Sequence, residues 1–273
     1  MAVPDLKEAI KNQDTLTASL LVAGHFSPGI SAAEYKTRVD ALTDAVKQDM
    51  LLFNTDEAGF RELVKRFYTK LAFTGSGQDF FSSKYSLLNE VIDYRTGIPV
   101  TLSILFCHIA STLGFNVSGV NFPGHFLIRY EISDERVLFV DPLDGKFLNW
   151  QELESLYFSI LGDMEEDEMP AEVLEAAEPQ DIVLRLLQNL KAAFIKEEKY
   201  QAALSTIELL IQFCPDDPYE RRDRGYLLHQ LECPQVAMAD YQYFIRQCPQ
   251  DPAAQLLKLQ IRHLSSEPPM ILH

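Results

Sequence analysis

A histidine and an aspartate lie at the ends of two short segments that are rich in β-branched and aromatic residues. The first segment runs from His125 to Ile132 and the second from Arg136 to Asp141, with residues 133–135 between them. This pattern predicts an antiparallel hairpin. If Ile132 pairs with Arg136, His125 and Asp141 become diagonal neighbours on one face of the sheet. An imidazole beside a carboxylate is the arrangement of a general base and the group that orients it.

Such a base acts on a nucleophile, and the sequence offers hydroxyl and thiol candidates in the apolar segment that follows Pro99. Thr101 and Ser103 are near its start, but a hydroxyl in an apolar helix usually bonds its own backbone. Cys107 lies two helical turns, or ~12 Å, beyond Pro99. We therefore expect Cys107 to be a small buried hydrophobe. A Ser103 nucleophile paired with His125 is the alternative that stays open.

Three polar residues precede the Gly97-Ile98-Pro99 sequence. Together with His125 and Asp141, they are the predicted binding residues. Asn89 and Glu90 are expected to cap or brace the connection, and substrate contact is the alternative. Arg95 is expected to pair with Glu90, and anion binding is the alternative. The His125 and Asp141 pair itself is either structural or a ligand-binding pair.

Metal and cofactor sites are not predicted from this sequence. No pair of the four cysteines has Cys-x-x-Cys spacing. No partner at the spacing of metal ligands accompanies His25, His108, His229 or His263. We therefore predict no metal, no cofactor and four free thiols.

The charge of the chain argues against nucleic-acid binding. Its 273 residues include 24 Lys and Arg against 40 Asp and Glu, a formal net charge of −16. This excess repels phosphate backbones. The arginines within residues 221–224 alternate with acidic residues, so we expect a solvated helix face there rather than a basic patch.

Neither a membrane span nor a secretory signal is predicted. The longest apolar stretch, residues 97–106, is too short to cross a bilayer. The first 14 residues lack a basic segment followed by an apolar one. We therefore expect a cytoplasmic protein without membrane insertion.

Amphipathic helices are predicted in the first part of the chain, because apolar residues recur at three and four positions from Asp5 to about Tyr68. One helix is expected to open at Ser31, with Glu34 in capping-box register. Residues 74–84 contain two glycines and four Ser or Thr residues and are predicted to form a surface loop.

Two further helices are expected on either side of the Gly97-Ile98-Pro99 sequence. The first covers residues 87–94, and the second begins at Val100, where Pro99 suits the first turn. Gly114 is the predicted stop of the second helix. Its apolar positions indicate that it is mostly buried.

An internal repeat of 34 residues, the tetratricopeptide period, follows an acidic segment. Residues 213–218 (FCPDDP) match residues 247–252 (QCPQDP), and Ala203 and Ala237 recur in register. Gly225 fits the repeat pattern, whereas Lys191 stands where the glycine of the first unit is expected. We predict two helical hairpins and a terminal helix over residues 253–264.

The runs Leu88–Ser103, Phe122–Phe126 and Phe139–Pro142, in this order and followed by the repeats, resemble a known bacterial family. Its members have a transglutaminase-like core and a C-terminal tetratricopeptide region, and they are often labelled invasion-regulator or SirB-type proteins. Active transglutaminases use a Cys at a helix N-terminus, a strand His as base and an Asp that orients it. A helix N-terminus suits that role because it lowers the pKa of a thiol.

The resemblance places His125 on the base, Asp141 on the orienting acid and Pro99 on the nucleophile. Proline has no nucleophilic side chain, so two of the three catalytic positions are kept and one is lost. The resemblance therefore implies a pseudoenzyme with a degenerate triad.

We predict an α+β fold in three parts. Residues 1–161 form a helical N-terminal part and a transglutaminase-like, papain-like core of a helix and an antiparallel sheet. Residues 162–180 form an acidic linker, and residues 181–273 form all-α tetratricopeptide-like hairpins.

The predicted function is a non-catalytic protein-interaction or regulatory module with a protein partner. The family label implies regulation of gene expression, and the acidic charge indicates that this role is indirect. The alternative is a hydrolase or acyl-transferase that uses His125 and Asp141 with Ser103 or a bound water. The position of the Ser103 hydroxyl relative to His125 separates these hypotheses.

Overall fold

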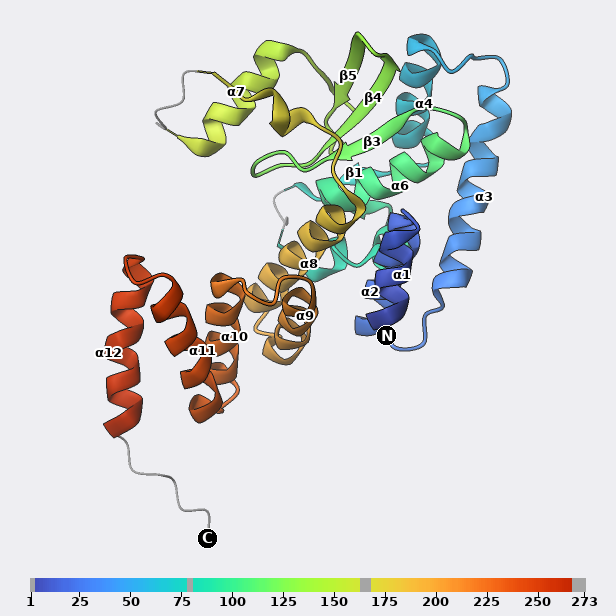
Figure 1. Ribbon diagram of the computed structural model, residues 1–273. Coiled ribbons are helices and arrows are strands. Elements are labelled where there is room, and N and C mark those ends of the chain that lie inside the picture. Colours follow the sequence, from blue (N-terminus) through green and yellow to red (C-terminus); the bar gives the residue numbers. More distant parts are fainter. Residues whose placement is uncertain (1–2, 78–80, 163–167, 267–273) are drawn as a thin grey trace. The chain divides into compact units, whose positions relative to one another are not determined.

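The structure is a computed structural model that describes residues 3–77, 81–162 and 168–266 (Figure 1). The chain divides into two compact units, Met1–Leu186 and Leu187–His273. Helices predominate in both units, and the first unit also contains a small antiparallel sheet. The predicted α+β class is therefore confirmed.

Four helices open the first unit: α1 (Val3–Lys11), α2 (Thr15–Phe26), α3 (Ala32–Met50) and α4 (Glu57–Thr69). Side chains cap the start of three of them. Ser31 Oγ accepts the backbone N–H of Glu34 at 3.4 Å, as predicted for α3. Asp14 caps α2 and Asp56 caps α4 in the same way. Each cap satisfies a backbone donor that has no partner within its helix.

The helix α6 (Pro99–Thr112) lies at the centre of the first unit and is preceded by α5 (Leu88–Tyr94). Pro99 occupies the first helical position, where its missing N–H removes no helical hydrogen bond. Gly114 has a φ of +91°, which lets the chain turn directly after the helix, as predicted.

The predicted loop over residues 74–84 is wrong at its beginning. Thr74–Gly75 (β1) pairs in parallel with Thr96–Gly97 (β2), and Ser83–Tyr85 forms the short 3-10 helix η2. The N–H of Ser76 donates to the carbonyl of Gly97 at 2.9 Å. Local composition missed this pairing because the partner strand lies far along the chain. Residues 78–80 of the predicted loop lie outside the described residues.

The sheet has the strand order β3-β4-β5-β6, with every pair antiparallel. The strands are β3 (Val117–Val120), β4 (Leu127–Ser133), β5 (Arg136–Val140) and β6 (Phe147–Leu148). Ile128 pairs with Val140, which is the predicted register at the open end of the hairpin. At the turn a bulge shifts the pairing, so Arg136 faces Ser133 and not Ile132.

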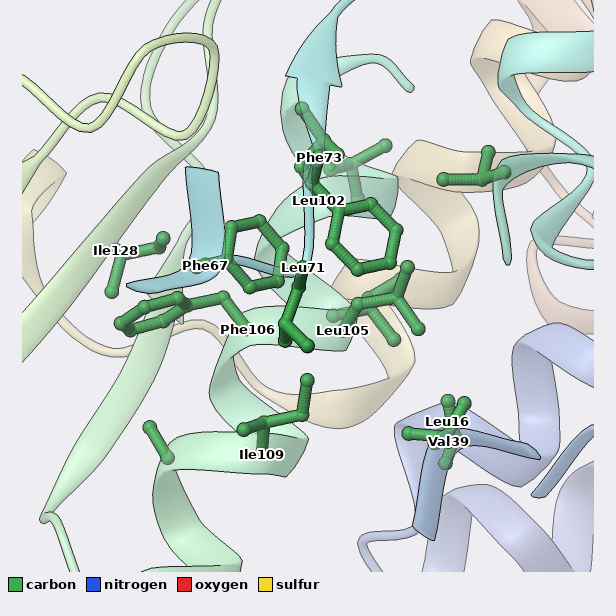
Figure 2. Packing of buried hydrophobic residues seen from close by; sticks show 14 of the residues in the cluster. Leu16, Val39, Phe67, Leu71, Phe73, Leu102, Leu105, Phe106, Ile109 and Ile128 are labelled. Atoms are coloured by element: carbon green, nitrogen blue, oxygen red, sulfur yellow. The ribbon is translucent and has the colours of Figure 1, made fainter. Parts of the chain in front are cut away.

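The core of the first unit packs around α6. Figure 2 shows Leu105 and Phe106 of α6 among Phe67 from α4, Phe73 and Ile128 from β4. The rings of Phe67 and Phe73 stack with centroids 4.6 Å apart, and Phe67 meets Phe106 edge to face at 5.3 Å. Burial of the first eight residues of α6 fixes the position of its N-terminus.

The helix α7 (Trp150–Leu161) follows the sheet, and the predicted linker of residues 162–180 follows α7. Residues 163–167 of that linker lie outside the described residues. Beyond them, Met169 and Leu174 are buried against Val120 and Leu127 of the sheet, and Ala171–Leu174 forms the 3-10 helix η3. This part of the segment packs on the first unit.

The C-terminal helices follow the predicted repeat. They are α8 (Pro179–Lys196), which runs across the division between the units, α9 (Tyr200–Phe213), α10 (Pro218–Gln230), α11 (Pro234–Gln247) and α12 (Pro252–Ser266). Ala203 and Ala237 are fully buried, as expected for helix contacts. A Cβ on Gly225 would lie only 2.7 Å from Cε1 of Tyr241, so the second repeat needs glycine there.

At the corresponding position, the first repeat has a paired lysine instead of a glycine. Lys191 Nζ contacts Glu220 Oε1 at 2.9 Å and Asp223 Oδ2 at 2.8 Å, which joins α8 to α10. The side chains of Lys191 and Glu220 are only 12% and 6% exposed. The first repeat therefore has a buried cation at the position where the second repeat has a glycine, which carries no side chain.

Candidate functional site

A hydrogen-bonded histidine and aspartate lie just before β4 and just after β5. His125 Nε2 is 3.0 Å from Asp141 Oδ2, so the structure brings together the two residues that the sequence selected. The other oxygen of Asp141 accepts the N–H of Leu143 at 2.9 Å. Nδ1 of His125 makes no hydrogen bond within the described residues, which leaves it open to another group.

Backbone contacts fix both residues of this pair. The N–H of Asp141 donates to the carbonyl of Lys146 at 2.8 Å. Arg185 of α8 donates from Nη2 to the carbonyl of His125 at 3.3 Å and from Nη1 to Asn121 Oδ1 at 3.2 Å. Nothing local in the sequence pointed to Arg185, because it lies sixty residues after His125.

The surroundings of Asp141 favour its ionised form. Burial alone raises the pKa of Asp141, but the hydrogen bond with His125, the charge on His125, the N–H of Leu143 and the charge of Lys146 together lower it below the usual value. Asp141 is therefore a carboxylate at neutral pH. It can orient the imidazole and stabilise a proton on it.

A buried tyrosine supports the turn that follows Asp141. The hydroxyl of Tyr68 donates to the carbonyl of Pro142 at 2.8 Å. Burial, followed by the charges of Asp141 and Asp144, raises the pKa of Tyr68, so the hydroxyl keeps its proton. Tyr68 was also missed from sequence, since an aromatic residue on an amphipathic helix is usually a core residue.

The strand β1 connects this pair to the start of α6. Gly75 donates its N–H to the carbonyl of Leu143 at 3.0 Å and pairs with Gly97 of β2. A Cβ on Gly75 would come within 2.7 Å of the Leu143 side chain. The turn after Asp141 and the turn before Pro99 therefore lie on two sides of one short strand.

The N-terminus of α6 has no side chain that caps its first amides. Its N-cap residue is Ile98, whose own N–H donates to Thr101 Oγ1 at 3.1 Å. The same hydroxyl donates to the carbonyl of Tyr85 or of Ile98, each 3.0 Å away. Thr101 is thus committed to the start of the helix. Pro99 occupies the helix N-terminus, where the helix dipole would lower the pKa of a thiol.

Neither remaining nucleophile candidate contacts His125. Ser103 is 1% exposed, and its hydroxyl lies 3.5 Å from the carbonyl of Leu127 and 3.9 Å from Cys107 Sγ. Burial raises the pKa of the Cys107 thiol to about 12, so almost no thiolate exists at neutral pH. Within the described residues, His125 therefore has neither a hydroxyl nor a thiol as hydrogen-bond partner.

The three residues predicted before Gly97 do not form the expected set of contacts. Asn89 is 2% exposed and donates from Nδ2 to Glu90 Oε1 at 3.2 Å. The expected pairing of Arg95 with Glu90 is wrong. Arg95 ends α5 in the left-handed conformation, with φ +58°, and its guanidinium carbon lies 5.0 Å from the ring centre of Phe73. The guanidinium therefore lies against Phe73 and makes no ion pair with Glu90.

Several buried polar atoms near the start of α6 have no hydrogen-bond partner within the described residues. They are Ser76 Oγ, Ser86 Oγ, Asn89 Oδ1 and Arg95 Nη1. Buried polar atoms are usually satisfied, so each exception calls for a cause such as strain, a functional role or a bound water. Ser76, in the predicted loop, and Ser86, just after it, were missed from sequence because serines in such segments carry no signal of burial.

An open pocket of about 600 Å³ adjoins Asp141. Its other lining residues come from β6, α7 and the segments next to them: Lys146, Leu148, Asn149, Gln151, Glu152, Ser155 and Leu156. A second pocket, of about 420 Å³, reaches Cys107 and His108 and contains neither His125 nor Asp141. The pocket beside Asp141 reaches the pair at Asp141, and His125 is not among its lining residues.

Two other kinds of site are absent from the part of the chain that the structure describes. No group of three or more His, Cys, Asp or Glu side chains is arranged to hold a metal ion there. None of the described helices is long and apolar enough to cross a membrane.

Comparison with protein-family models places the chain in a class. The transglutaminase-like superfamily model matches residues 33–188, more than half of the chain, and the tetratricopeptide repeat model matches residues 190–262. This chain therefore belongs to the transglutaminase-like superfamily and carries tetratricopeptide repeats. The resemblance predicted from sequence is confirmed.

Its relatives are bacterial proteins of similar extent. A UPF0162 protein from Vibrio cholerae is 37% identical over 80% of this chain and 80% of its own length. The UPF0162 protein PM0557 from Pasteurella multocida is 40% identical over 75% of this chain and 76% of its own. Protein SirB1 from Salmonella typhimurium is 29% identical over 86% of each chain.

Proposed function

We propose that this protein is a non-catalytic member of its superfamily that acts as a protein-interaction or regulatory module. One observation carries the proposal: Pro99 stands where the resemblance places the nucleophile, while the His125 and Asp141 pair is hydrogen-bonded. An oriented base without a nucleophile retains a shaped, polar binding site and has no group to form a covalent intermediate.

The C-terminal helices support the interaction role. Tetratricopeptide arrays present extended surfaces to which other proteins bind. The resemblance of the sequence to invasion-regulator proteins suggests a role in the regulation of gene expression. The net charge of −16 disfavours contact with nucleic acid, so we propose that such regulation acts through a protein partner.

The test compares the wild-type chain with His125→Ala and Pro99→Cys. We expect the wild type and His125→Ala to release equal, background amounts of ammonia from a glutamine-containing peptide and of acid from a simple ester. We expect the thiol of Pro99→Cys, although its position is buried, to react with iodoacetamide, because a helix N-terminus lowers the pKa of a thiol and the resemblance places His125 as its base.

The matched control is Pro99→Cys combined with His125→Ala, in which alkylation should slow by at least about tenfold, because the thiol loses its base. Turnover by the wild type that disappears in His125→Ala would show that the protein is an enzyme. In that case Ser103→Ala would establish whether the Ser103 hydroxyl is the nucleophile.

A further inference from the structure

The repeat period relates α12 to α10, one unit earlier. Leu256, Lys258 and Leu259 of α12 lie 34 residues after Arg222, Arg224 and Gly225 of α10. These three α10 positions all face α11, the second helix of their repeat. In the described residues, no helix stands in the corresponding place against α12.

Each of the three α10 residues makes a specific contact with α11. Arg224 binds Asp240 through two hydrogen bonds of 2.6 and 2.7 Å. Gly225 leaves space for the ring of Tyr241, because a Cβ at this position would lie only 2.7 Å from that ring.

Arg222 contributes the third contact, because its guanidinium carbon lies 5.5 Å from the ring centre of Phe244. The three α10 residues therefore contact α11 in three ways: through an ion pair, through close packing and through an aromatic ring.

The corresponding face of α12 is exposed. Leu256 and Leu259 are 69% and 62% exposed. The opposite face of the same helix is covered, since Ala254 and Leu257 pack in one cluster with Tyr241 of α11. Two leucines on this face are therefore left without a covering helix within the described residues.

Charge identifies what fits this face. Lys258 keeps the positive charge of Arg224 and makes no ion pair within the described residues. Residues 252–266 contain no Asp or Glu, although the whole chain is strongly acidic. A complementary partner therefore carries a carboxylate opposite Lys258. The partner also carries a small residue opposite Leu259. In α10 the corresponding residue is Gly225, which leaves space for a tyrosine, whereas Leu259 fills that space.

We propose that Leu256, Lys258 and Leu259 form a docking face for an amphipathic helix of a partner protein. The partner helix takes the position against α12 that α11 takes against α10. This inference builds on the proposed interaction role and assigns the chemistry of the partner. It does not depend on whether the His125 site is catalytic.

The probe is a synthetic, helix-stapled peptide with the sequence of residues 234–247 and Tyr241→Ala, which makes room for Leu259. It retains Asp240 and Phe244, the residues that contact Arg224 and Arg222 in the chain itself. We expect the full-length protein to bind this peptide, measured by fluorescence anisotropy. We expect Lys258→Glu and Leu259→Asp each to weaken binding at least about tenfold.

A charge exchange makes the test specific. A peptide that also carries Asp240→Lys should bind Lys258→Glu better than it binds the wild type. Lys199→Glu reverses a charge elsewhere in the second unit, where the side chain is 57% exposed, and should leave binding unchanged. Circular dichroism of each variant excludes misfolding as the cause of any loss.

Other results would overturn the proposal. Equal binding by the wild type, Lys258→Glu and Leu259→Asp would place the peptide elsewhere, and no binding would remove the docking face. A wild-type dimer in sedimentation that Leu259→Asp dissociates would assign the face to a second copy of the chain. None of these results changes the outcome of the His125→Ala turnover test, so the two proposals fail independently.

Discussion

The two units each contain a tightly paired polar cluster, and the clusters differ in what surrounds them. In the first unit Asp141, the partner of His125, adjoins an open pocket, and several polar atoms near the start of α6 are unsatisfied. In the second unit Lys191 is enclosed between Glu220 and Asp223. Both units contain a buried polar pair, and Arg221 Nε of the second unit is an unsatisfied buried atom too, so neither feature alone identifies a functional site. The open pocket beside Asp141 distinguishes the first cluster.

The largest effect is expected when the cluster of the second unit is broken. Lys191→Met leaves Glu220 and Asp223 without their cation, and losing one partner of a largely buried ion pair costs about 3 kcal/mol. Urea denaturation followed by circular dichroism measures this loss. Lys199→Met removes an exposed lysine and should change the free energy of unfolding by less than about 0.5 kcal/mol. Equal effects of the two substitutions would contradict a structural role for Lys191.

A glycine substitution tests why the two repeats differ at corresponding positions. Gly225→Ala forces a Cβ against Tyr241 and should destabilise the protein by about 1–2 kcal/mol, because overpacking outweighs the gain in helix propensity. Gly24→Ala in α2 is the matched control, since its Cβ would meet only Ile30 at an ordinary 3.8 Å. We expect that substitution to stabilise the protein by up to about 1 kcal/mol. Thermal unfolding distinguishes the opposite signs.

The smallest effect on stability is expected at the dyad. The lowered pKa of Asp141 means that its contribution is present above its ordinary value of 3.8 and disappears as the pH falls below it. Asp141→Asn should therefore cost about 1 kcal/mol at pH 7 and reduce the loss of stability as the pH falls from about 4 to about 2. Denaturant midpoints across this range provide the measurement.

The control for the dyad is Asp134→Asn, a substitution of an exposed turn residue that should leave the pH dependence unchanged. An Asp141→Asn variant with the acid dependence of the wild type would show that the carboxylate does not gain stability from His125.

Much of the candidate site follows from local rules of sequence. Pro99 and Gly114 delimit α6 because one lacks an N–H and the other accepts a positive φ. The alternation of the two strand segments is sufficient to place His125 near Asp141, because a strand has a strict period of two. The 34-residue period locates the helical hairpins of the second unit in the same way.

Other features were decided by contacts between distant segments. Arg95 was expected to pair with Glu90, but the left-handed end of α5 turns it toward Phe73. Thr74 and Gly75 were expected in a loop, but they pair with Thr96 and Gly97. In each case a partner outside the local window determined the geometry, and composition within the window carried no information about that partner.

The sequence by itself determined that proline stands at position 99, that His125 and Asp141 lie at the ends of the two strand segments, and that repeats follow. These are properties of residue identity and spacing, which folding does not change. The tertiary structure alone decided that the Ser103 hydroxyl is directed at the carbonyl of Leu127, that Arg185 and Tyr68 support the dyad, and that the α12 leucines are exposed. Burial and hydrogen-bond partners depend on which distant segments meet, and only the folded chain brings those segments together.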